Sequence, residues 1–185
     1  RRTLLMLAIT AVMGSGCVSH QMYREDSVVE EAGYTLAYIE FDDGLAYVMH
    51  EDGGTGGVAA VHPDGTVDHV VDGPQVVTEF SIAAGVSAYV SKTPTAPGTL
   101  FLSEDGEGSA IAHSSELDLV EAHHFTTISE GVEIDVWVYL PPGDEDVPTL
   151  LNIHGGPASQ YGFGFFDEFQ IYAGAGYGVV ACNPR

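Results

Sequence analysis

The sequence predicts a multidomain chain, with the C-terminal blades of a β-propeller over residues 1–120 and the first part of a parallel α/β domain over residues 121–185. Two observations predict this order. Short strands and hairpin turns recur about every 41 residues in the first part, with no helical pattern, which is typical of four-stranded propeller blades. In the second part a helical pattern lies between two apolar runs, and a strand, helix, strand order indicates a parallel sheet.

Two copies of the repeat share three landmarks: Gly44 and Gly85, Ala46-Tyr47-Val48 and Ala88-Tyr89-Val90, and the turns Asp64-Gly65 and Asp105-Gly106. Asp-Gly is a preferred pair in tight hairpin turns, and the runs between the landmarks have strand-like composition. Two or three blades do not close a propeller ring, so we expect the sequence to be part of a longer chain. The alternative is chance agreement between two hairpins in a chain with 23 glycines.

The first residues form a short apolar run with two interpretations. Leu4 to Val12 suits a buried strand of an earlier blade, whereas residues 1–17, ending in Cys17, also look like a signal segment with a lipid-anchoring cysteine. The run is too short to cross a bilayer, so we expect no membrane span. We predict a cytoplasmic protein, with export or lipid anchoring as the alternative.

The second part contains a helix between strands. The expected elements are an alternating strand over 133–140 with Ile134, Val136, Val138 and Leu140 on one face, a strand over 149–153 covered on both faces, a helix from Phe165 to Ala173, and a strand over 177–182. Asp167 and Glu168 suit the first turn of the helix, and Gly174 or Gly176 can end it in the left-handed conformation.

The charge and the scattered polar residues exclude several kinds of function. Five Lys and Arg against 27 Asp and Glu leave a net charge of −22, which repels nucleic acid and suggests a halophilic or marine source. The eight histidines show no metal-ligand spacing, and His123-His124 should point to opposite faces of a strand. The run Gly174 to Gly178 follows a helix and precedes a strand, whereas a dinucleotide-binding loop follows a strand and precedes a helix. We therefore expect no metal and no cofactor.

A glycine turn, His154-Gly155-Gly156-Pro157, directly follows the strand at 149–153. This position lies at the carboxyl edge of a parallel sheet, where ligands of α/β proteins bind. Glycines there let the backbone turn an N–H toward a developing oxyanion, as an acyl-transfer enzyme requires. A plain turn with a packed histidine would use the same residues.

Three motifs of the last 65 residues or so, in their order and spacing, resemble the start of the hydrolase domain of the prolyl oligopeptidase family of serine peptidases, in its acylaminoacyl-peptidase and dipeptidyl-aminopeptidase-like branch. They are Asn152-Ile153-His154-Gly155-Gly156-Pro157, Phe166-Asp167-Glu168-Phe169-Gln170, and Gly176 to Val180 with Asn183-Pro184-Arg185. The resemblance implies a propeller followed by an α/β-hydrolase domain. It also implies that the backbone N–H of Gly156 belongs to the oxyanion hole and that His154 and Gly155 shape the loop.

The implied activity is hydrolysis of short peptides or acyl-peptides by a serine nucleophile through an acyl-enzyme. No G-x-S-x-G occurs, and in this fold Ser, Asp and His follow the oxyanion loop, so we expect the whole triad to lie beyond Arg185. These 185 residues alone should therefore be inactive. The alternatives are an α/β-hydrolase esterase and a non-catalytic, propeller-based binding protein.

Overall fold

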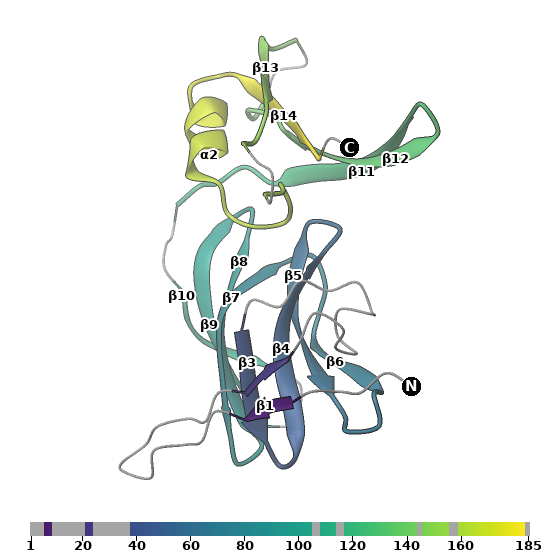
Figure 1. Cartoon of the computed structure of the whole chain (residues 1–185). Helices are drawn as coiled ribbons and strands as arrows, with labels where there is room; N and C mark the ends of the chain where they lie inside the picture. Colours follow the sequence, from purple (N-terminus) through teal and green to yellow (C-terminus); the bar gives the residue numbers. More distant parts are fainter. Residues whose placement is uncertain are drawn as a thin grey trace.

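A computed structural model describes residues 6–8, 21–23, 38–104, 108–113, 117–143, 146–155 and 159–183. Most of this structure is β-sheet (Figure 1). Strands β1 (Met6–Ala8) and β2 (Gln21–Tyr23) form a short antiparallel pair. A large sheet contains strands β3 to β10, and a smaller sheet contains strands β11 to β14 together with helix α2. In Figure 1 the smaller sheet and α2 lie above one end of the larger sheet.

The large sheet consists of two antiparallel four-stranded meanders. The first contains β3 (Tyr38–Asp42), β4 (Leu45–Asp52), β5 (Thr55–Val61) and β6 (Val67–Val71). The second contains β7 (Val76–Ala83), β8 (Val86–Thr93), β9 (Ala96–Ser103) and β10 (Ser109–His113). Strands β8 and β9 begin 41 residues after β4 and β5, so the predicted repeat is confirmed and is consistent with propeller blades.

The repeat also places equivalent turns of the two meanders beside each other. Asp43-Gly44 and Ala84-Gly85 form two-residue hairpin turns, each with positive φ at both positions. The carboxylate of Asp42 accepts hydrogen bonds from the backbone N–H groups of Ala84 (3.1 Å) and Gly85 (2.8 Å). One apolar cluster, around Val48 and Ala59, lies within the first meander. A second cluster is shared, with Val58 and Val71 of the first meander packed with Val77 and Phe80 of the second.

Gly53 and Gly54 form the turn between β4 and β5, both with positive φ, and β5 begins at Thr55. The predicted turn at Asp64-Gly65 joins β5 to β6, with the Asp64 side chain accepting from the Thr66 N–H at 3.0 Å. The turn at Asp105-Gly106 lies outside the described residues.

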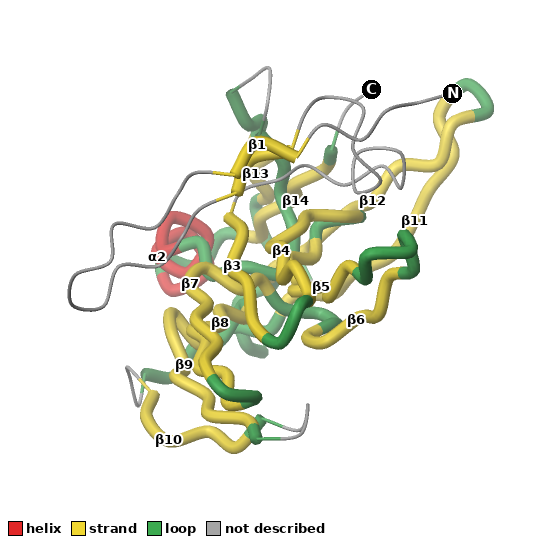
Figure 2. Tube along the Cα trace, turned by 60° about the horizontal axis from the view of Figure 1, so that its bottom comes forward, coloured by secondary structure: helices red, strands yellow, loops and turns green. Residues whose placement is uncertain are grey.

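The smaller sheet has the order β11-β12-β14-β13. Strands β11 (Ala122–Ser129) and β12 (Val132–Tyr139) form a hairpin, and β13 (Thr149–Asn152) runs parallel to β14 (Gly178–Cys182). Helix α2 (Asp167–Gly174), red in Figure 2, lies between β13 and β14 in the chain. The helix begins at Asp167 rather than at the predicted Phe165, because the backbone of Phe166 is extended. Gly176 (φ +89°) follows the end of α2 in the left-handed conformation.

In β12 the alternating residues Ile134, Val136 and Val138 share one face, as predicted, and Leu140 follows the end of the strand. Trp137 and Tyr139, on the other face, belong to the core cluster that includes Phe169 of α2. One packing prediction for this sheet is wrong. The strand at 149–153 is not covered on both faces: Leu151 is 62% and Ile153 73% exposed. Strand β13 lies at the edge of the described sheet, with β14 as its one strand neighbour among the described residues.

Candidate active-site loop

The carboxyl ends of the two parallel strands lie at the same edge of the smaller sheet. Asn152 ends β13 and pairs with Ala181 of β14, and His154-Gly155 follows two residues later. This is the edge at which α/β proteins bind ligands. Gly156 and Pro157, the other residues of the predicted oxyanion loop, lie outside the described residues.

Tyr161 links the ends of both parallel strands. Its backbone N–H donates to the side-chain oxygen of Asn183 at 2.7 Å, and the Asn183 amide donates back to the Tyr161 carbonyl at 2.9 Å. The Tyr161 hydroxyl donates to the side-chain oxygen of Asn152. Burial raises the pKa of Tyr161, with smaller contributions from Glu168 and Cys182, so the phenol stays a hydrogen-bond donor at neutral pH.

The hydrogen bonds from Tyr161 to Asn152 and Asn183 form what we call the Tyr161 bridge. His154 lies beside it. Its Nδ1 donates to the carbonyl oxygen of Gly155 at 2.9 Å, because a carbonyl can only accept. The imidazole packs edge-to-face against the Tyr161 ring, with centroids 5.1 Å apart. A Cβ added at Gly155 would meet no described atom within 4 Å.

The bridge residue was not predicted from sequence. Asn152 and Asn183 were recognised only as members of two separate motifs, and Tyr161 was not recognised at all. No local pattern marks it, because its partners lie 9 and 22 residues away. Its ring also joins the aromatic cluster with Phe166 and Phe169 that fixes α2 on the sheet.

The two adjacent histidines do lie on opposite faces of β11. The Nε2–H of His124 donates to the Asp135 carboxylate at 2.8 Å, and the His124 ring packs against Trp137 and Phe163. Both histidines are exposed to solvent. Within the described ranges, no group of three or more His, Cys, Asp or Glu side chains is arranged to hold a metal. The helical part of the described chain is too short to cross a membrane.

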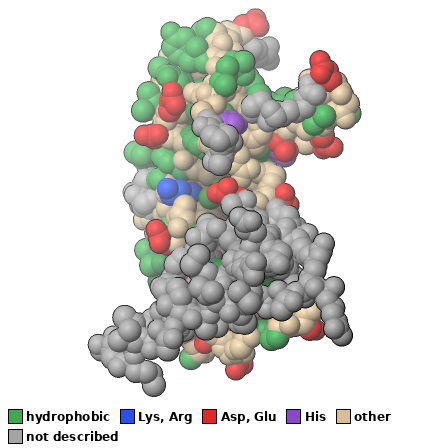
Figure 3. Space-filling model, in the orientation of Figure 1, with side chains coloured by type: hydrophobic (Ala, Val, Ile, Leu, Met, Phe, Trp, Pro, Cys, Tyr) green, Lys and Arg blue, Asp and Glu red, His purple; other side chains and the backbone are tan. Residues whose placement is uncertain are grey.

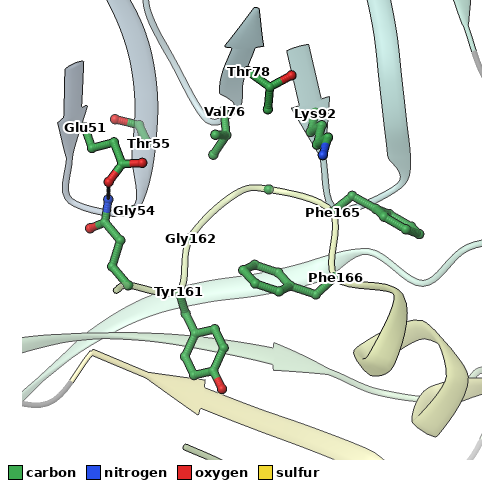
Figure 4. Close-up of a pocket in the computed structure, with 12 residues that line it drawn as sticks. Glu51, Gly54, Thr55, Val76, Thr78, Lys92, Tyr161, Gly162, Phe165 and Phe166 are labelled. Atoms are coloured by element: carbon green, nitrogen blue, oxygen red, sulfur yellow. Dashed lines mark hydrogen bonds between the residues drawn. The ribbon is translucent and has the colours of Figure 1, made fainter. Parts of the chain in front are cut away.

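A cavity of about 200 Å³ lies between the two sheets (Figure 4). The large sheet contributes Glu51, Val76, Thr78 and Lys92 to its walls, and the segment from Gln160 to Phe166 covers it. Sequence reasoning did not identify this cavity, although Lys92 is the single lysine of the chain.

The contact between the sheets depends on two glycines. The Gly54 carbonyl oxygen accepts from the Phe163 N–H at 2.8 Å. A Cβ at Gly54 would lie 2.5 Å from the Trp137 ring, and a Cβ at Gly162 would collide with the Gly54 carbonyl group. Gln170 of α2 adds a second contact, donating to the carbonyls of Pro94 (3.0 Å) and Val120 (2.9 Å) and accepting from the Val120 N–H (2.7 Å).

The fold matches one part of the structures of known peptidases. An acylaminoacyl peptidase from Pyrococcus horikoshii matches with a TM-score of 0.79 and 26% identity, over 91% of this chain and 28% of that one. An acylaminoacyl peptidase in complex with Z-Gly-Gly-Phe-chloromethyl ketone matches with a TM-score of 0.77 and 25% identity, over the same shares.

A curated relative agrees with the structural matches. The uncharacterized peptidase YuxL of Bacillus subtilis is 28% identical over 152 residues, which is 75% of this chain and 23% of that protein. No model of a known protein family matches the chain. The chain is thus related to serine peptidases of the prolyl oligopeptidase family, and it spans about a quarter of the length of the relatives it matches.

Proposed function

We propose that the chain is part of a serine-type peptidase that hydrolyses short peptides or acyl-peptides through an acyl-enzyme. The observation that carries the proposal is the position of His154-Gly155, directly after β13 at the edge where both parallel strands end. In this proposal the Gly156 backbone N–H stabilises the oxyanion, and His154 and Gly155 shape the loop. The bridge from Tyr161 to Asn152 and Asn183 holds the loop in place.

The domain boundaries form part of the same proposal. Residues 1–120 would be the end of a propeller, supported by the two meanders with a 41-residue offset. Residues 121–185 would be the start of an α/β-hydrolase domain, supported by the parallel pair β13 and β14 with α2 between them. The serine, aspartate and histidine of the triad would follow in the longer protein.

A peptide substrate is favoured over an ester because the three matched proteins named above are peptidases. The peptidic ligand of one matched structure, Z-Gly-Gly-Phe-chloromethyl ketone, is blocked at its N-terminus. That ligand supports acyl-peptides among the substrates. An esterase of the same fold and a non-catalytic binding protein are the competing interpretations.

The test uses the full-length protein that contains this chain. We expect it to react with a fluorophosphonate serine probe and to hydrolyse N-acetyl-alanyl p-nitroanilide. Hydrolysis of p-nitrophenyl esters without any anilide cleavage would favour the esterase. Absence of both probe labelling and hydrolysis would favour the binding protein. The 185-residue polypeptide by itself should show neither reaction.

A loop variant tests the assigned oxyanion donor. Gly156→Pro removes the backbone N–H, and we expect kcat for the anilide to fall by about 100-fold or more, with a smaller change in KM. Gly174→Ala is the matched control, since a Cβ at Gly174 meets nothing within 4 Å at the end of α2. An unchanged kcat in Gly156→Pro would refute the assignment.

A further inference from the structure

Strand β11 forms one long edge of the smaller sheet. The sheet has the order β11-β12-β14-β13, so β12 is the one strand beside β11 among the described residues. The pairing with β12 is continuous from Ala122 to Ser129, with no shift in register. The hairpin of β11 and β12 projects from the rest of the molecule in Figure 1, and hydrophobic side chains lie on its surface in Figure 3. Phe125 is 49% and Ile128 74% exposed.

The other strand edges in the described parts of the chain carry features that prevent pairing. Strands β1, β2 and β13 have only three or four residues. The registers of β6 and β10 shift within the strand, and β3 carries Glu40 and Asp42. Short length, bulges and charges are the usual protection of a sheet edge. Strand β11 has eight residues and contains no Asp, Glu, Lys, Arg or Pro, in a chain with 27 Asp and Glu. Its edge is therefore suited to pair with another strand.

The turn of the hairpin determines which backbone groups of β11 face this edge. Glu130 and Gly131 form a two-residue turn with positive φ at both positions. In such a hairpin the residues that flank the turn, here Ser129 and Val132, exchange backbone hydrogen bonds. Hydrogen-bonded and non-hydrogen-bonded pairs then alternate along the strands. The residues whose N–H and C=O groups point away from β12 are therefore Ala122, His124, Thr126 and Ile128.

A second copy of β11 is the strand that matches this edge. The outward residues are spaced symmetrically about Phe125. In an antiparallel pair centred on Phe125, Ala122 lies opposite Ile128 of the second copy, and His124 lies opposite Thr126. Every outward N–H and C=O group then has a partner. The same surface serves both copies, as in twofold dimers.

The charges at the two ends of β11 favour the same register. Glu121 precedes the strand and Glu130 follows it. In the antiparallel pair Glu121 lies opposite Ser129 of the second copy, and Glu130 lies opposite Val120, so no carboxylate faces another. At the centre the two Phe125 side chains lie opposite each other, and aromatic pairs of this kind stabilise neighbouring strands.

We propose that the protein dimerises by antiparallel pairing of β11 with β11 of a second copy, about a twofold axis at Phe125. The two smaller sheets would then form one continuous sheet. The contact area of a single strand pair is small, so we expect a reversible dimer whose population depends on protein concentration. The proposal goes beyond the proposed hydrolysis and does not depend on it.

Analytical ultracentrifugation of the full-length protein over a range of concentrations tests the proposal. We expect a monomer–dimer equilibrium. Phe125→Glu places two like charges opposite each other at the axis and should weaken dimerisation at least about tenfold. Thr127→Glu is the matched control, on an exposed residue of the same face. Its carboxylate would lie opposite His123 of the second copy, so the dimer should persist.

Cysteine cross-linking tests the register without adding charge. The Cα atoms of the two Phe125 residues should lie about 4.5 Å apart, which suits a disulfide, so Phe125→Cys should form a covalent dimer under mild oxidation. The two Thr127 Cα atoms should lie about 14 Å apart, too far for a disulfide, so Thr127→Cys should behave like the wild-type protein.

Three outcomes would overturn the proposal. A protein that stays monomeric at every concentration has no such contact, as would be the case if another segment of the longer chain covers β11. A dimer that Phe125→Glu leaves intact forms through a different surface. Cross-linking of Thr127→Cys in place of Phe125→Cys excludes the twofold axis at Phe125.

Discussion

The Gly54 carbonyl oxygen accepts a 2.8 Å hydrogen bond from the backbone N–H of Phe163, which joins the turn between β4 and β5 to the segment that follows the candidate active-site loop. The two backbones approach so closely because Gly162 has no Cβ. This contact brings the large sheet next to the smaller one and forms one wall of the cavity between them.

Gly162→Ala should therefore destabilise the protein. A Cβ at this position collides with the Gly54 carbonyl, and overpacking of this kind costs about 1–3 kcal/mol of unfolding free energy. Urea denaturation measures the loss. Gly174→Ala, at an uncrowded position at the end of α2, should not lower the unfolding free energy. Equal stability of the two variants would contradict the contact.

Gln170→Leu should also destabilise the contact between the sheets. The substitution leaves the Val120 N–H without its acceptor and removes the donor to the Pro94 and Val120 carbonyls. A cost of about 2–3 kcal/mol in unfolding free energy follows from three hydrogen bonds. Ile171→Gln, an exposed neighbour on the same helix, serves as control and should change stability by less than about 0.5 kcal/mol.

Asp42→Ala should loosen the two meanders from each other. Its carboxylate holds the N–H groups of Ala84 and Gly85 in the equivalent turn of the next meander. We expect a loss of about 2 kcal/mol in thermal or urea unfolding. Asp43→Asn, at the next residue, is the control. Asp43 has φ +45°, a conformation that Asn also adopts, so the unfolding free energy should not change. A loss in the control as large as in Asp42→Ala would show that the turn itself, not the contact, is at fault.

His50 should make the stability of the protein depend on pH. Burial lowers its pKa, His69 lowers it further, and Asp72 and Asp52 oppose the shift. The unfolded chain then binds the proton more readily, so the unfolding free energy should fall as pH drops below about 6.5, until the folded-state pKa is passed. His50→Leu should flatten this slope in urea titrations at a series of pH values. The exposed His123→Gln should leave the slope as it is.

The net charge of −22 predicts a response to salt. Raising NaCl from about 0.1 M to 1 M shortens the screening length from about 10 Å to about 3 Å, which weakens repulsion among surface carboxylates. If the halophilic hypothesis is correct, the Tm should rise steadily over this range. A constant or falling Tm in differential scanning calorimetry would argue against a halophilic source.

Most elements of the fold were determined by local sequence patterns. The 41-residue offset, the two-residue turns at Asp43-Gly44 and Ala84-Gly85, and the strand, helix, strand order around α2 all follow from periodicity and turn chemistry that neighbouring residues set. The position of His154-Gly155 directly after β13 follows from the order of elements, because that order fixes which strand ends meet.

Contacts between distant residues were decided only by the tertiary structure. Alternation along β12 did not reveal that its core side carries Trp137 and Tyr139, since that depends on where α2 packs. The Tyr161 bridge between Asn152 and Asn183 joins residues from separate segments. Sequence periodicity describes one element at a time, whereas these features depend on strand order, register and the close approach of two glycines.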